Sequence, residues 1–484
     1  MQLLDLITIF IFALGIVIMG LSFSGKGRNM KSFFAAGGAV PWLMSGLSLF
    51  MGFFSAGTFV VWGSIAYSLG WIAISIQWTM AIAGFVVGFF IAPRWHKTSA
   101  LTVAEYITRR LGVNTQKTYT YLFLFISLFT TGSFLYPVAK IVEVSTGMPL
   151  DLCILLLGGF CIVYVAAGGL WAVVSTDVLQ FIILTAAVLI VVPLSFGRVG
   201  GVVNFIESIP ATYFNLVNGE YTIGFIVAFG VYNTIFLGGN WAYVQRYASV
   251  NSQSSARKVG FLFGGLYVVS AVLWMLPPMI YRIVNPSLST IDAEGAYLMM
   301  CKEVLPAGLL GLMLSGMVFA TASSLNATLN ISSGVVTNDI FKRLFPQSSD
   351  KTLMRVARIS TIIFGLLAII VALLIPLMGG IVNVVISVAA LTGVPLYLPI
   401  IWTLFSKRQT EYSVITTTLV SLGANAFFKF ITPLWGFGFN RAEEMIVGVA
   451  FPVLCLIAFE LYYKLNHKIS HRYVEYQEWE KENN

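Results

Sequence analysis

The sequence is divided into apolar runs of about 20 residues that carry almost no charge, and this pattern limits the chain to folds that span a membrane. An α-helix needs about 20 apolar residues to cross the hydrocarbon core of a bilayer. Hydrophobic residues make up 58% of the chain and charged residues only 10%, whereas soluble domains carry about 25% charged residues. A soluble fold could not bury so much apolar surface, so the lipid bilayer is the expected solvent.

About thirteen such runs are expected to be spanning helices, which predicts an all-α membrane protein made of one transmembrane domain over residues 1–484. The run 4–23 lacks the basic start and the cleavage site of a signal peptide, so we expect it to be the first span. The expected spans are 4–23, 42–67, 72–92, 118–140, 150–171, 175–195, 222–240, 259–281, 307–330, 357–377, 382–404, 412–432 and 444–463.

The basic residues indicate how the chain is oriented. The net charge is +8, and most of the 28 Lys and Arg residues fall in alternate loops. Cytoplasmic loops of membrane proteins are enriched in Lys and Arg. This places the N-terminus outside and the tail 464–484 in the cytoplasm, in a multi-pass protein of the plasma membrane, expected to be a bacterial inner membrane. No basic run interleaved with aromatic residues suggests a nucleic-acid partner, and no obligatory protein partner is evident.

Two of the expected spans contain residues that interrupt helices. Gly52 and Gly57 bracket the middle of 42–67, and Gly230 and the Gly-Gly-Asn stop at 238–240 lie in 222–240. Paired interrupted helices are a sequence indication of a transporter site at the bilayer midplane. Glycine also permits close helix packing, and a GxxxG pair at 84–88 is assigned to packing alone.

The spacing of the two interrupted spans fits a five-plus-five inverted repeat. The first repeat is expected over 41–195 and the second over 222–404, so that each interrupted helix opens its half. One extra helix at 4–23 precedes the repeats, and two helices at 412–463 follow them.

The sequence contains no pattern typical of an enzyme. No HExxH, GxSxG or pair of membrane acids is found, and the four cysteines show no CxxC spacing that would suggest a metal site or a disulfide. A non-transporting solute sensor is the alternative of another class. The tail 464–484 is too short for an output domain, which disfavours it.

Several stretches resemble the sodium:solute symporter family. Residues 164–180 (YVAAGGLWAVVSTDVLQ) look like its signature, and residues 305–346 are similar to the ninth helix of sodium–glucose cotransporters. The resemblance covers about residues 5–405. It implies a LeuT-type fold and sodium-driven symport of a small organic solute into the cell by alternating access. Shorter matches are LPPMIYR at 276–282, VQRYAS at 244–249 and SFFAAGGAVPWLMSGLSLF at 32–50.

The resemblance also implies a sodium site between two helices. Its ligands would be the backbone carbonyls of Met51, Phe54 and Ala320 and the hydroxyls of Ser323 and Ser324. Positions 320, 323 and 324 share one helical face, and hard cations take oxygen ligands. The alternative is that the two serines only bond the carbonyl four residues earlier.

Asp177 is one of few acidic residues near membrane depth, and such a residue is a functional hypothesis by default. In the family it lies near the serine pair, which implies a role in sodium release or tuning. The alternative is a first-turn helix acid that faces water. A second sodium would require hydroxyls at Asn326 and Ala327, so one sodium is favoured; proton coupling through Asp177 stays open.

The solute site is expected between the interrupted helices and their neighbours. Asn233 and Phe236 resemble the asparagine and the gating aromatic of sugar-transporting relatives, and Gln77 lies where those relatives have a polar or acidic residue. Interhelical hydrogen bonding is the alternative role for each side chain. The candidate solute-binding residues are Ser55, Thr58, Gln77, Asn233 and Phe236.

Two departures from galactose-type relatives leave the solute open. Those relatives have a Glu–Gln pair where this chain has Gly57 and Thr58, and a lysine where it has Tyr267. No Lys or Arg is expected at mid-membrane, and an unpaired buried carboxylate is costly. A neutral polar solute such as a sugar or polyol is therefore expected first, followed by an amino acid and then a monocarboxylate.

Overall fold

The computed structural model describes residues 2–24, 40–100, 102–165 and 170–483, and within these ranges only helices occur as regular structure. The helices are α1 (Leu3–Ser24), α3 (Trp42–Met51), η2 (Thr58–Trp62), α4 (Gly63–Leu69), α5 (Trp71–Val86), η3 (Val87–Ile91), α6 (Ala92–Lys97), α7 (Val103–Leu111), α8 (Val113–Thr146), α9 (Leu150–Val165), α10 (Leu170–Arg198), α11 (Val202–Ser208), η4 (Ala211–Phe214), α12 (Ile223–Gly239), α13 (Trp241–Ala248), α14 (Gln253–Val284), η5 (Asp292–Gly295), α15 (Ala296–Val304), α16 (Leu309–Gly334), η6 (Val335–Phe341), α17 (Lys342–Leu344), α18 (Asp350–Leu374), η7 (Ile375–Met378), α19 (Ile381–Val388), η8 (Ala389–Gly393), α20 (Val394–Thr403), α21 (Glu411–Ala426), η9 (Phe427–Ile431), η10 (Thr432–Trp435), α22 (Arg441–Leu465) and α23 (His471–Asn483).

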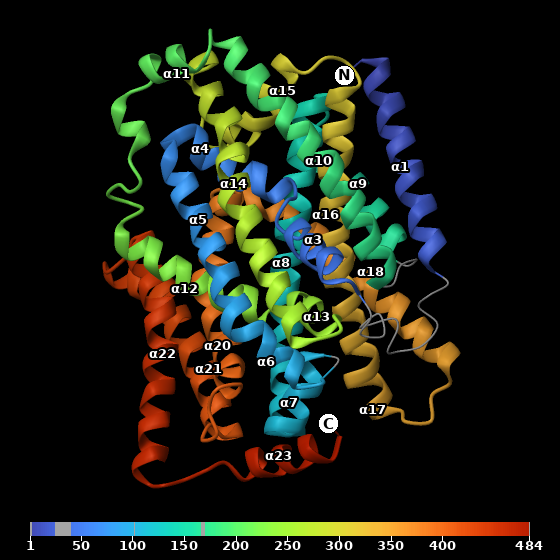
Figure 1. The fold of residues 1–484 in the computed structure, drawn as a ribbon, viewed down its shortest axis with the longest axis vertical. Coiled ribbons are helices and arrows are strands. Elements are labelled where there is room, and N and C mark those ends of the chain that lie inside the picture. Colours follow the sequence, from blue (N-terminus) through green and yellow to red (C-terminus); the bar gives the residue numbers. More distant parts are fainter. Residues whose placement is uncertain (1, 25–39, 101, 166–169, 484) are drawn as a thin grey trace.

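Every one of the expected spans contains helix. Eight helices of the described part are long and apolar enough to cross a membrane, or nine when the bent pair α12–α13 counts as one span. The others are broken or short, so a total of thirteen spans stays a prediction. The N- and C-terminal ends of the chain lie at opposite ends of the molecule (Figure 1), which is the arrangement that an odd number of spans requires.

The first interruption lies where the sequence predicts it. Helix α3 ends at Met51, residues 52–55 form turns and bends, and helical structure resumes before Thr58. An irregular backbone at membrane depth is tolerated only where it is buried in protein or lines a cavity. Met51 before the break and Phe54 within it are each 1% exposed, so this break is buried in protein.

The second interruption is a bend of 58° between α12 and α13. The Asn240 side chain caps α13 by accepting a hydrogen bond from the Ala242 amide at 3.0 Å. Gly239 packs so tightly that an added Cβ would lie 2.7 Å from the Tyr397 Cβ. Gly230 lies inside continuous α12, and the prediction of an interruption there is wrong. The apolar residues on both sides of Gly230 continue the helix through it.

The GxxxG pair at 84–88 serves packing, as the sequence predicts. A Cβ at Gly84 would lie 2.7 Å from the Gly264 backbone nitrogen, and one at Gly260 would lie 2.5 Å from the Gly88 Cα. Two stripes of small residues therefore face each other on α5–η3 and α14, which lets the two backbones approach closely.

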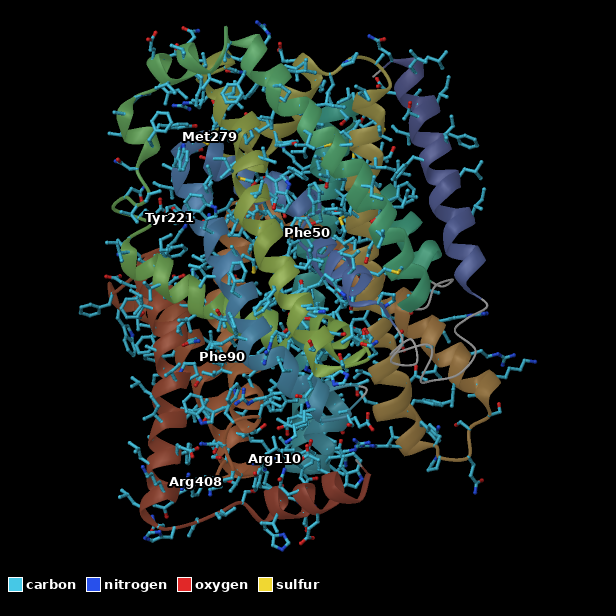
Figure 2. The ribbon with its side chains drawn as sticks, viewed as in Figure 1. Phe50, Phe90, Arg110, Tyr221, Met279 and Arg408 are labelled. Carbon is cyan, nitrogen blue, oxygen red and sulfur yellow. The ribbon has the colours of Figure 1, made fainter. Side chains whose placement is uncertain are left out.

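Helix α23 gives the tail a defined position. It lies across the end of the molecule that also carries α7 (Figure 1), and Arg110 lies at this end in Figure 2. The Arg109 guanidinium lies 3.9 Å from the Trp479 ring centroid, and the Tyr106 and Tyr476 rings are 5.9 Å apart. Cation–π and aromatic contacts thus hold the predicted tail against the molecule.

Asp5 fastens the extra helix α1 to the start of α16. It is 1% exposed, and its Oδ1 accepts hydrogen bonds from the amides of Gly308 at 2.7 Å and Gly311 at 3.1 Å. These amides belong to the first turn of α16, where backbone donors lack helical partners and a carboxylate is favoured by the helix dipole. A Cβ at Gly311 would lie 2.3 Å from the Asp5 carbonyl oxygen, so the two backbones are in close contact.

Asp5→Ala is expected to lower the free energy of unfolding by about 1–3 kcal/mol, because it leaves two buried amides without an acceptor. The measurement is the thermal midpoint of the protein in detergent. Asp151→Ala is the matched control, since Asp151 also lies in the first turn of a helix but is exposed. Equal midpoints for the two variants would show that the Asp5 contacts contribute nothing.

Candidate functional site

Two adjoining cavities lie inside the helical bundle between the two interrupted helices. The larger has a volume of about 180 Å³ and is lined by η2, α5, α8, α12, α19 and η8. The smaller, of about 80 Å³, reaches toward α13 and is also lined by α3, α10 and α16. The residues that border both cavities are Gly52, Ile126, Thr130, Phe134, Phe236, Tyr243 and Tyr397.

Aromatic side chains form the partition between the cavities. The Phe236 ring centroid lies 5.5 Å from that of Tyr243, edge-on at 84°, and 5.9 Å from that of Tyr397. Behind them, Phe50 lies near the middle of the molecule (Figure 2) and is 1% exposed. The Phe50 and Phe54 rings are 5.7 Å apart, so the backbone break is surrounded by rigid aromatic packing.

All five candidate solute-binding residues line the larger cavity. Gln77 is 3% exposed and Ser55 is 3% exposed, and neither side chain has a hydrogen-bond partner among the residues that the structure describes. A buried polar group is expected to be hydrogen-bonded. Two unpartnered polar side chains at the wall of one cavity are therefore available to a bound molecule.

The side-chain amide of Asn233 already makes one hydrogen bond within the protein. Its Nδ2 donates to the Thr79 hydroxyl at 2.8 Å, and that hydroxyl donates to the Ile76 carbonyl at 2.6 Å. The carbonyl oxygen of the Asn233 side chain remains as the acceptor. Thr58 donates its hydroxyl to the Phe53 carbonyl, so Thr58 contributes to the wall chiefly through its methyl group and its hydroxyl lone pairs.

Tyrosine residues that the sequence analysis did not select complete the larger cavity. Tyr232, Tyr243 and Tyr267 border it, and their hydroxyls have no hydrogen-bond partner in the described part of the chain. Tyrosines in apolar helices are typical of core packing, so the pattern gave no signal for them. None of the described residues that line this cavity is acidic or basic.

Two of the candidate sodium ligands border the smaller cavity from different helices. Met51 and Ser324 line it, while Phe54 and Ala320 are buried nearby, each 1% exposed. The Ala56 amide donates to the Thr321 hydroxyl at 3.0 Å, which joins the break after α3 directly to α16. The side chain of Ser323 lies outside the described part of the structure.

Two of the candidate ligand oxygens lie close together on α16. The Ser324 hydroxyl donates to the Ala320 carbonyl, and the two oxygens are 3.4 Å apart. This is the bond that a mid-helix serine ordinarily makes to the carbonyl four residues earlier. The sodium role of these two oxygens therefore stays a prediction.

Asp177 lies deeper in its helix than the sequence suggests. Helix α10 begins at Leu170, so Asp177 is not a first-turn acid, and it is 2% exposed. Its Oδ2 accepts a hydrogen bond from the Ser48 hydroxyl of α3 at 2.6 Å. Asp177 borders the smaller cavity together with Ser324.

Arg246 lies beyond the expected span 222–240, so the sequence predicts a cytoplasmic loop residue, and that prediction is wrong. The structure places it on α13, 7% exposed, at the wall of the smaller cavity. Its Nη2 donates to the Ser48 hydroxyl at 3.4 Å, so Ser48 bridges it to Asp177, whose charge acts on the guanidinium. A basic residue six positions after a Gly-Gly-Asn stop is expected to be a loop charge, and nothing in the sequence distinguishes a buried one.

A profile of the family described as "SSF: Sodium:solute symporter family" matches residues 33–420. The chain belongs to the sodium:solute symporter family. The sodium/glucose cotransporter of Vibrio parahaemolyticus is 29% identical over 88% of this chain and 86% of its own length. The sodium/myo-inositol cotransporter 2 of Sus scrofa is 27% identical over 86% of this chain and 68% of its own length.

Solved structures show the fold of this symporter. A sodium-coupled sialic acid symporter in a substrate-bound, outward-open state has a TM-score of 0.80 at 21% identity, covering 95% of this chain and 98% of that chain. Mhp1, a nucleobase-cation-symport-1 family transporter, has a TM-score of 0.58 at 14% identity, covering 93% and 99%. The chain therefore has the LeuT-type fold that the resemblance implied.

Membership of the family gives the coarse function. The chain is a multi-pass membrane transporter and not an enzyme, and it carries a small-molecule solute together with sodium, its coupling ion. The prediction of sodium-coupled symport is confirmed at this level.

Proposed function

We propose that this symporter carries a neutral polar solute the size of one monosaccharide or polyol into the cell. The observation that carries this proposal is the larger cavity, whose described lining contains no charged residue and includes the unpartnered amide of Gln77. Apolar walls with a few convergent polar groups are the usual design of small-molecule sites. Hydroxyl groups both donate and accept, and they can therefore satisfy Gln77, Ser55 and the tyrosine hydroxyls together.

The volume of the cavity supports one ring and not two. An engineered apolar cavity of about 150 Å³ holds a benzene molecule, and the larger cavity here has about 180 Å³. The names of the two relatives, which carry glucose and myo-inositol, agree with a six-membered ring. Gly57 and Tyr267 line the cavity where galactose-type relatives carry Glu and Lys, so this solute is held by different contacts.

An amino acid or a monocarboxylate is the less favoured substrate. Its carboxylate would be buried in the larger cavity without a cationic partner, which is costly. The nearest buried cation described there, Arg246, lies at the smaller cavity and faces Asp177 through Ser48.

For the coupling ion we propose one sodium held by the carbonyls of Met51, Phe54 and Ala320 and the hydroxyls of Ser323 and Ser324. A cage without charged ligands binds an ion weakly enough to release it. Asp177 lies beside Ser324 at the smaller cavity and is proposed to receive the ion on its way out. The Phe236 ring, which borders both cavities, is proposed to separate the bound solute from the path by which it leaves through the smaller cavity.

The same proposal includes the topology and the orientation. Repeat one spans 41–195 and repeat two 222–404, with the helix at 4–23 before them and those at 412–463 after them. The end with α7 and α23 faces the cytoplasm, and the end with α11 and α15 faces outward (Figure 1). The abundance of basic residues in loops of the α7 end supports this orientation.

Gln77→Ala is expected to weaken solute binding by roughly 10- to 100-fold, because it removes a buried amide whose hydrogen bonds are made only with solute. The measurement is a thermal-shift screen of purified protein against monosaccharides, polyols, amino acids and short carboxylates, with and without sodium. The control is Gln116→Ala, which removes an equally buried amide that donates to Thr120 away from both cavities.

A stabilising shift from a sugar or polyol that the Gln77 variant loses and the Gln116 variant keeps would support the proposal. A shift given only by amino acids or carboxylates would contradict it.

A further inference from the structure

Glu294 is a buried carboxylate at the end of the molecule that carries α15, and neither cavity wall includes it. It lies in η5, between α14 and α15, and is 3% exposed. Its Oε2 accepts a hydrogen bond from the Tyr136 hydroxyl of α8 at 2.9 Å. Its Oε1 accepts one from the Ile381 amide, the first residue of α19, at 3.0 Å. One carboxylate thus joins three segments that are far apart in the sequence.

Two of these segments form walls of the larger cavity. Helix α8 contributes Ser133 and Phe134, and α19 contributes Val385 and Val388. The loop that carries Glu294 also packs against η2 and α4, the outer half of the first interrupted helix. The walls of the cavity therefore converge on Glu294 at this end of the molecule.

The backbone before α19 is shaped around this carboxylate. Gly379 and Gly380 have φ values of +85° and +89°, in the region that favours glycine. A Cβ at Gly380 would lie 2.7 Å from the Glu294 Oε1. The amide of Ile381 has no partner within its own helix, and a carboxylate at a helix N-terminus satisfies that amide and the helix dipole together.

We propose that Glu294 is a latch that holds α19 against α8 and thereby closes the outer end of the solute cavity. Movement of α19 away from α8 requires the carboxylate to give up the Tyr136 or the Ile381 hydrogen bond. Its two hydrogen-bond partners, Tyr136 and Ile381, do not line the solute cavity, so Glu294 is a positioning residue. The latch rests on the proposed orientation and transport path, but its test below requires no solute.

Nearby charges, burial and hydrogen bonds all act on the pKa of the Glu294 carboxyl. Lys140 and Glu143 of α8 lie nearby and pair with each other at 2.9 Å, and both act on Glu294 with opposite signs. Burial raises the pKa of the Glu294 carboxyl above its usual range, although the hydrogen bonds from Ile381 and Tyr136 oppose the shift. Glu294→Gln keeps an acceptor oxygen at this position and should therefore keep the latch.

The test measures how fast a small cationic thiosulfonate reacts with a cysteine introduced in each cavity, in purified protein whose native cysteines are replaced. Val388→Cys reports on the larger cavity at α19, and Thr328→Cys reports on the smaller cavity at α16. Glu294→Ala is expected to raise the reaction rate at position 388 by about 10-fold, corresponding to about 1.4 kcal/mol, and to leave the rate at 328 equal or lower. Tyr136→Phe is expected to act in the same direction with a smaller increase, and Glu294→Gln to stay near the parent rate.

A purely structural role would loosen the whole bundle and raise both rates, and this result would overturn the latch. An unchanged rate at 388 in both Glu294→Ala and Tyr136→Phe would overturn it too, as would a Gln variant that reacts as fast as the Ala variant. Failure of the solute screen would leave these rates as predicted, so the two proposals fail separately.

Discussion

Replacement of both Ser323 and Ser324 by alanine is expected to abolish sodium-driven solute uptake while the protein still inserts and folds. The substitution removes both side-chain oxygens of the proposed sodium cage, and the carbonyls of Met51, Phe54 and Ala320 are too few to replace the water shell of a hard cation. The measurement is initial uptake into proteoliposomes as a function of sodium concentration.

Ser315→Ala supplies the matched control for this experiment. Ser315 lies on the same helix, is 2% exposed, and donates to the Gly311 carbonyl at 2.7 Å, so it resembles Ser324 in its local bonding. Its removal is expected to leave the sodium dependence unchanged. Normal sodium dependence in the double variant would show that the site is elsewhere.

Asp177→Ala is expected to lower the free energy of unfolding by about 3–5 kcal/mol and to stop transport. The reason is Arg246, which is 7% exposed and would be left as a buried charge facing only the Ser48 hydroxyl and the Ala242 carbonyl. Arg246 and Asp177 are joined through the Ser48 hydroxyl, and a buried charge left without its counter-charge is strongly destabilising. Unfolding in detergent by a chemical denaturant measures the change.

The double variant Asp177→Asn with Arg246→Gln separates stability from transport. It removes both charges and keeps the shapes, so much of the lost stability should return. Transport should stay impaired, because no carboxylate remains beside Ser324. A double variant as unstable as Asp177→Ala would show that the two charges do not depend on each other.

The fold was largely predictable from the sequence because the bilayer imposes strong rules. Each apolar run contains helix. The break after Met51 lies in a Gly-Phe-Phe-Ser-Ala-Gly segment whose glycines and serine favour helix poorly. The break at Asn240 was readable for the same reason. Gly230 was misread because a single glycine in an apolar helix is tolerated as readily as it breaks the helix.

The site was predictable only in part. The polar candidates Gln77, Ser55 and Asn233 stood out in apolar spans, and the structure brings them to one cavity. The tyrosines did not stand out, since an aromatic ring in a span is typical of packing. Arg246 and Glu294 were missed because burial of a charge depends on tertiary contacts with Ser48, Tyr136 and Ile381, and local sequence does not encode those contacts.

The central claim, symport of a neutral polar solute driven by sodium, is tested most directly in proteoliposomes that contain the purified protein. A panel of radiolabelled monosaccharides and polyols is offered under an imposed inward sodium gradient, and separately under a pH gradient in sodium-free buffer. We predict that one panel member accumulates above its external concentration only under the sodium gradient, and that the gain disappears in the Ser323 and Ser324 double variant. Accumulation driven by the pH gradient without sodium would contradict the account.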